Sequence, residues 1–439
     1  MEMSEILRRF RRNAAMILGS RLLSGVLNLA TSAIVVRVFG LGDLGMVVLL
    51  YAYAQLFSQV LRFESWQALL TYGTGRFEAD PPAFRRLLGV TLSLDAATAA
   101  LGILAGLALL PWAGGLFDWP PAVTGFAPVF LLVVPFITQG TPNGVLRLVD
   151  RVDVLAWQHA MNAGLRLGGV LLAWAAEAGV GGLVAAWFAG TVLAGLWQWG
   201  AALHQLARRG LLPRLPPGPR AVGREFPGLW RFVGLTNVLS ALDLVHKAGT
   251  VMAVGALLGA PAAATLQIAQ QFAMAVAKPV GQLGPIIAPE FARLAAANDW
   301  VTFRRLIGRQ VRIMALVMGG LGAVILAGLG PLLSAVYGPV VLDDIWLFRL
   351  LLAATLIMTV FFSFGPALLS AARPGTLVAV RVLSIGIYVG VALACLEAWG
   401  LLSVGIGVLV SRAVSLTLIV LIGRRLLRRR IRRSRAPGA

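Results

Sequence analysis

The sequence predicts an all-α polytopic membrane protein, with twelve transmembrane helices in two pseudo-symmetric six-helix lobes around a central cavity. Three observations lead to this prediction. Of the 439 residues, 59% are hydrophobic and only 13% are charged, which is about half the charged share of an ordinary globular chain. The apolar residues form runs long enough to cross a bilayer, and a short motif recurs about halfway along the chain.

Each apolar run is close to the roughly 20 residues that a helix needs to span the hydrocarbon core. The first, residues 13–36, follows four arginines, as the apolar part of a signal peptide would. It is too long for that role and Arg21 interrupts it, so we expect a transmembrane helix. The other eleven predicted helices are 44–70, 87–110, 122–146, 153–176, 181–206, 226–258, 262–288, 307–336, 345–371, 376–397 and 401–423.

Positive charge alternates between the connections of these runs. Most of the 38 basic residues lie at ends that would share one side of the membrane, within 8–12, 76–86, 147–151, 208–224, 293–309, 373 and 424–435. The connections on the other side, such as 40–43, 114–121 and 338–344, contain none. The positive-inside rule then places both termini in the cytoplasm. This pattern also explains the formal charge of +20, so no nucleic-acid partner is expected.

The motif at 302–308 repeats the motif at 83–89, and equivalent residues such as Phe84 and Phe303 lie 219 positions apart. Because this offset is half the chain, we expect two equivalent lobes joined by one connection. The predicted parts are an N-terminal six-helix lobe (1–207), a cytoplasmic Pro/Arg-rich linker (208–225), a C-terminal six-helix lobe (226–423) and a basic cytoplasmic tail (424–439).

The composition of the linker and of the tail predicts how each of them behaves. Prolines at 213, 216, 217 and 219 prevent a helix from continuing through the linker. The tail is basic enough to lie on the head groups of anionic lipids. Its alternative role is a stop signal that fixes the topology.

Polar residues enter the membrane as stripes on the first, second, seventh and eighth predicted helices. On the seventh, Ser240, Asp243, Lys247 and Thr250 have the spacing i, i+3, i+7, i+10, which is one face of a helix. The offset of 219 maps them onto Arg21, Ser24, Asn28 and Thr31 of the first. The second helix carries Tyr51, Gln55, Gln59 and Arg62, and the eighth carries Gln267, Gln271, Lys278 and Gln282. Lipid cannot satisfy such groups, so the four stripes are expected to line one interior cavity.

Cations outnumber acids in this interior, and an ionised side chain at the membrane centre costs roughly 2.5–3.5 kcal/mol unless it has a partner. A dianionic lipid diphosphate would be such a partner, because arginine binds phosphate in a bidentate manner and lysine binds it as a point charge. Asp243 and Lys247, one turn apart, could instead neutralise one another. The candidate substrate-binding residues are Arg21, Asn28, Gln59, Arg62, Asp243, Lys247 and Lys278.

Two weaker stripes have two readings. Residues His159, Asn162 and Arg166 on the fifth helix, and Arg381, Ser384 and Tyr388 on the eleventh, either border the cavity or form hydrogen bonds between helices. Asp95 and Arg412 stand alone in apolar runs, and the sequence assigns them no role. Prolines such as Pro285 and Pro366 interrupt helices that would have to bend in a transporter.

The sequence shows no signature of a metal site or a cofactor. Its three histidines and its single cysteine, Cys395, do not have the spacing of metal ligands. We therefore expect no metal, no cofactor and no catalytic residue.

With these motifs the chain resembles the polysaccharide (O-antigen type) flippases of the multidrug/oligosaccharidyl-lipid/polysaccharide exporter superfamily. The resemblance covers nearly the whole chain. It is clearest at Gly40–Gly45, Trp66–Gly73, 257–259, 268–272, 278–279 and 289–294. In that family the seventh helix often carries an aspartate followed closely by an arginine. Here Leu244 follows Asp243 and the next cation is Lys247, which leaves the role of Asp243 open.

The resemblance implies a fold and a function. The fold would have twelve or fourteen helices in two lobes around a V-shaped cavity, lined by helices one, two, seven and eight. The function would be to move a polyprenyl-diphosphate-linked oligosaccharide, such as an O-antigen or lipopolysaccharide precursor, from the cytoplasmic to the periplasmic leaflet of the bacterial inner (plasma) membrane. Such a protein is not an enzyme. Its expected partners are that lipid-linked glycan, anionic lipids at the tail and glycan-assembly proteins.

Three alternatives stay open. A multidrug cation antiporter of the same superfamily would need a more acidic cavity than this surplus of arginine and lysine provides. A membrane-embedded glycan polymerase or ligase would need a sizeable extracytoplasmic loop, and the longest here is 113–121. A scaffold without transport activity would leave the buried charges unexplained.

Overall fold

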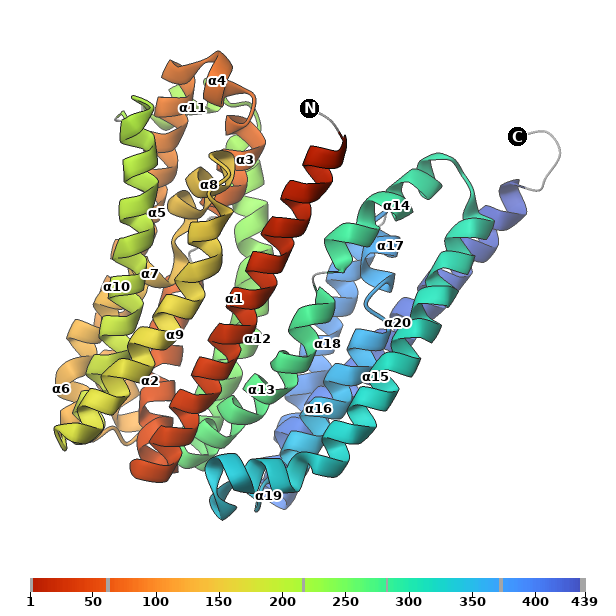
Figure 1. Ribbon diagram of the computed structural model, residues 1–439. Coiled ribbons are helices and arrows are strands. Elements are labelled where there is room, and N and C mark those ends of the chain that lie inside the picture. Colours follow the sequence, from red (N-terminus) through yellow and green to blue (C-terminus); the bar gives the residue numbers. More distant parts are fainter. Residues whose placement is uncertain (1–2, 61–63, 215–217, 282, 371–373, 435–439) are drawn as a thin grey trace. The chain divides into compact units, whose positions relative to one another are not determined.

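The computed structural model describes residues 3–60, 64–214, 218–281, 283–370 and 374–434, and helices make up most of these ranges (Figure 1). No strand forms within them, which confirms the all-α prediction. The chain divides into two compact units, Met1–Ala264 and Thr265–Ala439.

Within the described residues, seven helical stretches are long and apolar enough to cross a membrane. They are Ala15–Val38, Leu41–Ser58, Pro81–Leu116, Val123–Leu148, Gly179–Arg208, Trp300–Tyr337 and Leu402–Arg428, and shorter apolar helices cover Ala248–Leu258, Ile345–Val360 and Ala379–Ala394. The chain is therefore a multi-pass membrane protein.

The first unit holds the helices from the N-terminus to the start of α13. Their bounds are α1 Met3–Val38, α2 Leu41–Val60, α3 Ser65–Gly73, α4 Arg76–Ala79, α5 Pro81–Leu116, α6 Pro121–Phe130, the 3₁₀ turn η1 Leu131–Val133, α7 Val134–Thr138, α8 Gly140–Leu148, α9 Val152–Ala175, α10 Gly179–Arg208, α11 Pro219–Glu225 and α12 Leu229–Leu258. Helix α13 covers Ala260–Gly281. Helix α9 packs along both α1 and α10. Glycines permit this approach, since a Cβ at Gly169 would lie 2.7 Å from that of Ala186.

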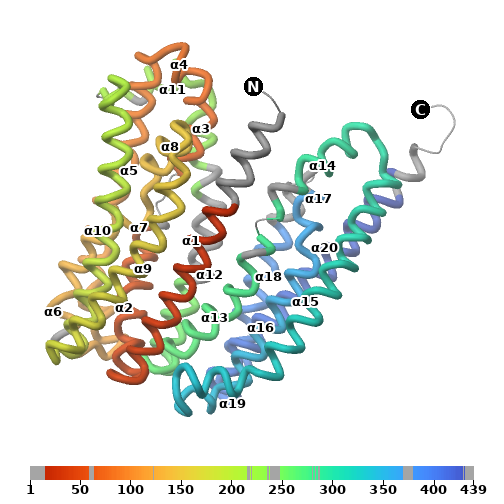
Figure 2. Tube along the Cα trace, viewed as in Figure 1, coloured from red at the N-terminus to blue at the C-terminus, as the bar shows by residue number. Residues whose placement is uncertain are grey.

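Helix α12 packs against α2 and α3 (Figure 2). A Cβ at Gly255 would lie 2.2 Å from Leu49, and one at Gly45 would lie 1.9 Å from the carbonyl oxygen of Ala260. These close contacts explain why the first compact unit continues to Ala264, past the predicted start of the second lobe at residue 226. The division into lobes by the sequence repeat is a different criterion and stays a prediction.

The second unit contains α14 Gly284–Ala296, α15 Trp300–Tyr337, the 3₁₀ turn η2 Pro339–Val341, α16 Ile345–Val360, α17 Phe364–Ser370, α18 Pro374–Ala394, α19 Leu396–Trp399 and α20 Leu402–Ser434. Helix α20 packs against α16 and α18, and α14 packs against α17. The predicted tail begins as a continuation of α20. Its Arg430 lies over the Trp300 ring, with 5.2 Å from the guanidinium carbon to the ring centroid.

The two repeated motifs occupy equivalent places in the two units. The carboxylate of Asp80 accepts a hydrogen bond from the Ala83 amide (3.1 Å) and so caps α5. The carboxylate of Asp299, which is 219 residues later, caps α15 through the Thr302 amide (3.0 Å). Behind each cap a phenylalanine of the motif is buried, Phe84 in the first unit and Phe303 in the second. The sequence repeat is thus a structural repeat.

Candidate functional site

The structure places the side chains of three predicted substrate-binding residues. Arg21 and Asn28 lie on α1 in the first unit, and Lys278 is exposed on α13 in the second. Gln59 lies on α2, and Asp243 and Lys247 lie on α12, but their side chains are outside the described part. Arg62 lies outside the described residues altogether.

The polar side chains on the stripe of α1 are of two kinds. Some form hydrogen bonds within the helix, and Arg21 does not form an ion pair among the described residues. The Asn28 amide donates to the Ser24 carbonyl (2.7 Å) and to the Ser24 hydroxyl (3.3 Å). The Thr31 hydroxyl donates to the Leu27 carbonyl (2.7 Å), a bond within the same helix. Arg21 is exposed and forms no ion pair among the described residues. Within this stripe, its guanidinium is therefore the group that is available to an anion.

A second guanidinium of the first unit belongs to Arg147. This residue lies in the last turn of α8. Its guanidinium carbon lies 4.8 Å from the centroid of the Trp66 ring on α3, in a cation–π contact. Among the described residues Arg147 also has no acidic partner. Arg147 is thus a positive charge that is held against an aromatic ring.

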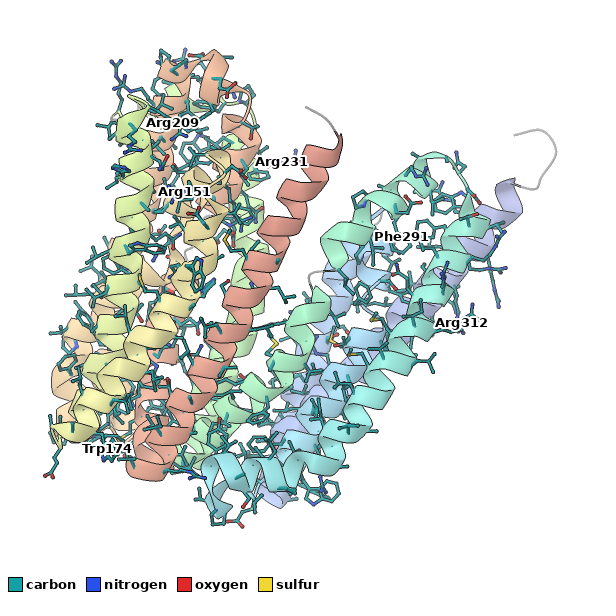
Figure 3. The ribbon with its side chains drawn as sticks, in the orientation of Figure 1. Arg151, Trp174, Arg209, Arg231, Phe291 and Arg312 are labelled. Carbon is teal, nitrogen blue, oxygen red and sulfur yellow. The ribbon has the colours of Figure 1, made fainter. Side chains whose placement is uncertain are left out.

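Arg21 and Arg147 lie at different depths in their apolar stretches. At about 1.5 Å per residue, Arg21 is about 9 Å from the start of the apolar stretch Ala15–Val38. Arg147 is next to the last residue of the apolar stretch Val123–Leu148. The labelled Arg151, Arg209 and Arg231 lie toward the end of the unit where α1 begins, and Trp174 lies toward the opposite end (Figure 3).

Trp66 is itself held in place. Its indole Nε1 donates to the carboxylate of Glu64, which precedes the first turn of α3. The side-chain amide of Gln67 donates to the same oxygen at 3.4 Å. The Glu64 residue is only 6% exposed, so this acid is engaged within the protein. Arg147 therefore rests on a fixed aromatic surface.

Asp95 joins the elements that carry Trp66 and Arg147. From the middle of α5, its Oδ1 accepts the Ser65 hydroxyl (2.6 Å) and its Oδ2 accepts the Thr141 amide (2.7 Å). Ser65 begins α3, and Thr141 is in the first turn of α8, which follows a break at Gln139 with φ 17°. Amides at the start of a helix lack an intrahelical partner, and lipid cannot supply one. The carboxylate satisfies one such amide and ties three spans together.

The weaker stripes on the fifth and eleventh predicted helices each include a residue with a described hydrogen bond to a neighbouring helix. Arg166 Nη2 donates to the Thr191 hydroxyl of α10 (3.0 Å), and its guanidinium carbon lies 4.8 Å from the Tyr51 ring centroid. In the second unit, Ser384 of α18 contacts Ser415 of α20 through their hydroxyls. Both contacts favour the packing alternative over a cavity border.

The roles of Asp95 and Arg147 could not be predicted from the sequence. Asp95 received no role because its partners, a hydroxyl and a backbone amide, follow no side-chain pattern. Arg147 was counted only as a signal of topology. An arginine within one turn of the end of the fourth apolar run, with a tryptophan near the end of the second, was the available hint.

No protein-family model matches the chain. Its fold is found in solved transporters of low sequence identity. A multidrug resistance MATE family transporter of the MOP superfamily, in an inward-facing conformation, superposes with a TM-score of 0.70 at 14% identity, over 94% of this chain and 96% of that one. The lipid II flippase MurJ, in an inward closed conformation, gives a TM-score of 0.69 at 10% identity, over 93% of this chain and 87% of MurJ.

The chain therefore shares the helical fold of these MATE and MurJ transporters. A curated relative is more specific. Inner membrane protein YghQ of Escherichia coli (strain K12) is 30% identical over 314 residues, covering 71% of this chain and 86% of YghQ. The chain belongs to the family of YghQ, and it is a multi-pass inner membrane protein.

Proposed function

We propose that the protein moves a polyprenyl-diphosphate-linked oligosaccharide from the cytoplasmic to the periplasmic leaflet of the inner membrane by alternating access. The observation that carries this proposal is the exposed guanidinium of Arg21 on the polar stripe of a transmembrane helix, without an acidic partner among the described residues. Such a group suits a diphosphate, which offers two charges and several acceptor oxygens. The fold shared with a lipid II flippase supports a lipid-linked substrate.

The same proposal covers the other predicted site residues. Asn28, Gln59, Arg62, Asp243, Lys247 and Lys278 would contact the substrate during its passage, and the surplus of cations would favour a dianion. An O-antigen or lipopolysaccharide precursor is the glycan that fits the resemblance seen in the sequence. Glycan-assembly proteins would deliver it, and anionic lipids would contact the basic end of α20.

Multidrug cation antiport is the second candidate, because the MATE transporter superposes as well as MurJ does. A cationic drug would meet repulsion from Arg21. Antiport therefore predicts that Arg21→Gln preserves or improves transport, whereas glycan transport predicts its loss.

The test is the fate of lipid-linked glycans in a deletion strain. We expect the oligosaccharide to be synthesised and to accumulate on the cytoplasmic face, and wild-type protein to restore its export. Arg21→Gln should reach normal membrane abundance and fail to restore export. Arg151→Gln is the matched control, because Arg151 is paired with Asp153 (2.7 Å) on the protein surface. Normal glycan export in the deletion strain would contradict the proposal.

The proposed orientation places both termini in the cytoplasm. Gly218→Cys, before α11, and Gly115→Cys, near the end of α5, lie on opposite sides in this orientation. In intact cells whose outer membrane has been made permeable, an impermeant thiol reagent should label only the second. Labelling of Gly218→Cys from outside would reverse the orientation.

A further inference from the structure

A narrow apolar pocket lies in the second unit between the start of α15, helix α17 and the C-terminal part of α20. Trp300 and Phe303 line it from α15, and Phe364 lines it from α17. All three belong to one buried cluster, and Leu427 of α20 packs against that cluster. Arg430 of α20 also borders the pocket and is the one charged residue among its described lining residues. The pocket thus has apolar walls and one guanidinium at its edge.

The mouth of the pocket lies at a boundary of the membrane. Trp300 begins the apolar stretch Trp300–Tyr337, and Arg430 closely follows the end of the stretch Leu402–Arg428. From Arg430 the pocket follows α20 back to Gly423, which is about 10 Å along the helix axis at about 1.5 Å per residue. Tryptophan and arginine are both typical of the level of the lipid head groups. A lipid with its head group at this level has its acyl chains at the level of the pocket.

In the first unit the equivalent cluster is covered by the linker. Phe84, the repeat equivalent of Phe303, shares a buried cluster with Val222 and Phe226 of the linker region. In the second unit no described residue after Leu427 belongs to the cluster around Phe303. The described part of the second unit thus leaves open a face that the first unit buries under its own chain.

The residues at the mouth of the pocket differ between the two repeats. Arg430 has the repeat position of Leu211, and Trp300 has that of Pro81. Leu211 is 6% exposed and belongs to the cluster of the first unit. Arg430 is exposed and forms no ion pair among the described residues. A ligand for this place therefore needs an apolar part for the pocket and an anionic part for the guanidinium.

The surroundings of Arg430 are basic. The acids described near the start of α15 are engaged, because Glu290 pairs with Arg293 (2.6 Å) and Asp299 caps the helix. Basic clusters at a membrane surface attract anionic lipids. The exposed arginines on these parts of α15 and α20 are Arg304, Arg305, Arg309, Arg424, Arg425 and Arg428.

We propose that this pocket binds one acyl chain of an anionic phospholipid, and that Arg430 binds its phosphate. The guanidinium lies over the Trp300 ring, 5.2 Å from its centroid, so it is held at the mouth of the pocket. The lipid takes the place that the linker fills in the first unit and completes the packing of α15, α17 and α20. The proposal rests on the proposed function only for the anionic lipid at α20, and it is independent of the transported cargo.

The experiment measures lipid binding to the purified full-length protein in detergent by native mass spectrometry. The probes are phosphatidylglycerol and phosphatidylcholine with the same acyl chains. We expect phosphatidylglycerol to bind more tightly, and Arg430→Gln to weaken its binding about fivefold through loss of one charge near an anionic head group. Binding of phosphatidylcholine, which has no net charge, should depend little on Arg430.

Arg425→Gln is the matched control. Arg425 is also an exposed arginine of α20, but it lies about 200° around the helix from Gly423 and so faces away from the pocket. Its loss should change phosphatidylglycerol binding less than about twofold, because salt screens charges that do not contact the lipid. Equal weakening by Arg425→Gln and Arg430→Gln would indicate diffuse attraction to basic residues and would overturn the proposal.

The apolar part of the pocket is tested at Gly423. A Cβ at this position would lie 3.6 Å from the Phe364 ring, which is an ordinary contact, so Gly423→Ala should fold and retain binding. Gly423→Leu would extend into the pocket and should weaken phosphatidylglycerol binding at least as much as Arg430→Gln does. If Gly423→Leu fails to accumulate, phosphatidylglycerol with a photoreactive acyl chain gives a second test on the wild type. It should label the peptides that contain Phe364 and Leu427.

The remaining outcomes separate this proposal from the proposed function. Unchanged binding in Gly423→Leu, or labelling confined to other helices, would overturn the pocket as the lipid site. Displacement of phosphatidylglycerol by farnesyl diphosphate at a lower concentration would assign the pocket to the transported lipid and would also overturn the proposal. If the pocket binds phosphatidylglycerol as expected but the deletion strain exports its glycan normally, the proposed function fails while the lipid site remains.

Discussion

A membrane helix is interrupted at equivalent positions in the two units. The units differ in how the polar backbone groups at the interruption are accommodated. Helix α3 begins at Ser65 and α14 begins at Gly284, which are 219 residues apart. In the first unit the Asp95 carboxylate bonds the Ser65 hydroxyl and the Thr141 amide. The position equivalent to Asp95 in the second unit is Met314, whose thioether is only a weak acceptor.

The second unit uses proline instead. Pro285 lies in the first turn of α14, where a proline has no N–H that would need a partner. A broken helix within a membrane must either bond its free amides or lack them. A carboxylate that accepts hydrogen bonds from residues at two helix breaks also holds these breaks together. A proline removes the unpaired N–H at its own break and does not connect it to another. In the first unit, the hydrogen bonds of Asp95 therefore fix the starts of α3 and α8, and with them the side chains that these helices carry.

Among the changes that test this comparison, loss of the Asp95 carboxylate should reduce the stability of the protein most. Asp95→Ala removes the acceptor of two hydrogen bonds and leaves the Thr141 amide without it. With about 1.5–3 kcal/mol for each hydrogen bond to a charged group, we expect destabilisation of about 3 kcal/mol or more. Thermal unfolding of the purified protein, followed by gel filtration, measures the change. Met314→Ala is the matched control and should cost about 1 kcal/mol, because Met314 is only half-buried. Equal losses at the two positions would contradict the comparison.

A smaller effect is expected at the glycine that begins α8. A Cβ at Gly140 would lie 1.9 Å from the Ser65 hydroxyl oxygen and 3.0 Å from Asp95 Oδ1. Gly140→Ala should therefore displace the Ser65 side chain and break its bond to Asp95, at a cost of about 1.5–3 kcal/mol. At Gly284 nothing lies within 4 Å of an added Cβ, so Gly284→Ala should leave the unfolding temperature unchanged or raise it. The reverse order of the two variants would show that the first break is not tightly packed.

The sequence predicted the fold well because the signals of the fold are local. Hydropathy locates the apolar runs, and one offset relates Asp80 to Asp299 and Phe84 to Phe303. Pro285 and Pro366 were also visible as helix interruptions, since proline acts on its own backbone. The compact boundary after Ala264 was not predictable, because it depends on the contact of α12 with α2.

The site was predicted only in part. Arg21 stood out because a cation in an apolar run is costly wherever the chain folds. Arg147 did not, because a cation near the end of a span is what topology alone requires. Its contact with Trp66 joins residues 81 positions apart, and the Thr141 amide bound by Asp95 is a backbone group that every residue possesses. Side-chain pattern cannot reveal such partners.

The ion pair between Arg86 and Glu225 is another feature of the first unit, and its expected contribution to stability is smaller. Arg86 Nε and Nη2 donate to Glu225 (2.6–3.0 Å), which joins α5 to α11 in the linker. The side chains are 35% and 25% exposed, so screening limits the coupling to about 1 kcal/mol or less. A double-mutant cycle with Arg86→Gln and Glu225→Gln, read by thermal unfolding, should give this value. Arg305→Gln removes the repeat-related guanidinium, which is exposed, and should have little effect. A coupling near zero would mean that the linker is not held by this pair.

The smallest effect is expected at the cap of α15. Hydrogen bonds from the Thr302 hydroxyl and amide to the carboxylate hold the pKa of Asp299 below its usual value of 3.8. Because the folded-state pKa is lowered, this stabilisation is fully present above the unfolded-state pKa and is lost as the pH falls through the folded-state pKa. Asp299→Asn keeps an acceptor at the cap but cannot ionise. The unfolding temperature of the wild type should therefore exceed that of Asp299→Asn slightly at pH 7, and the difference should shrink below pH of about 4. A difference that stays constant from pH 7 to the acid limit of folding would show that the charge of Asp299 does not contribute to the cap.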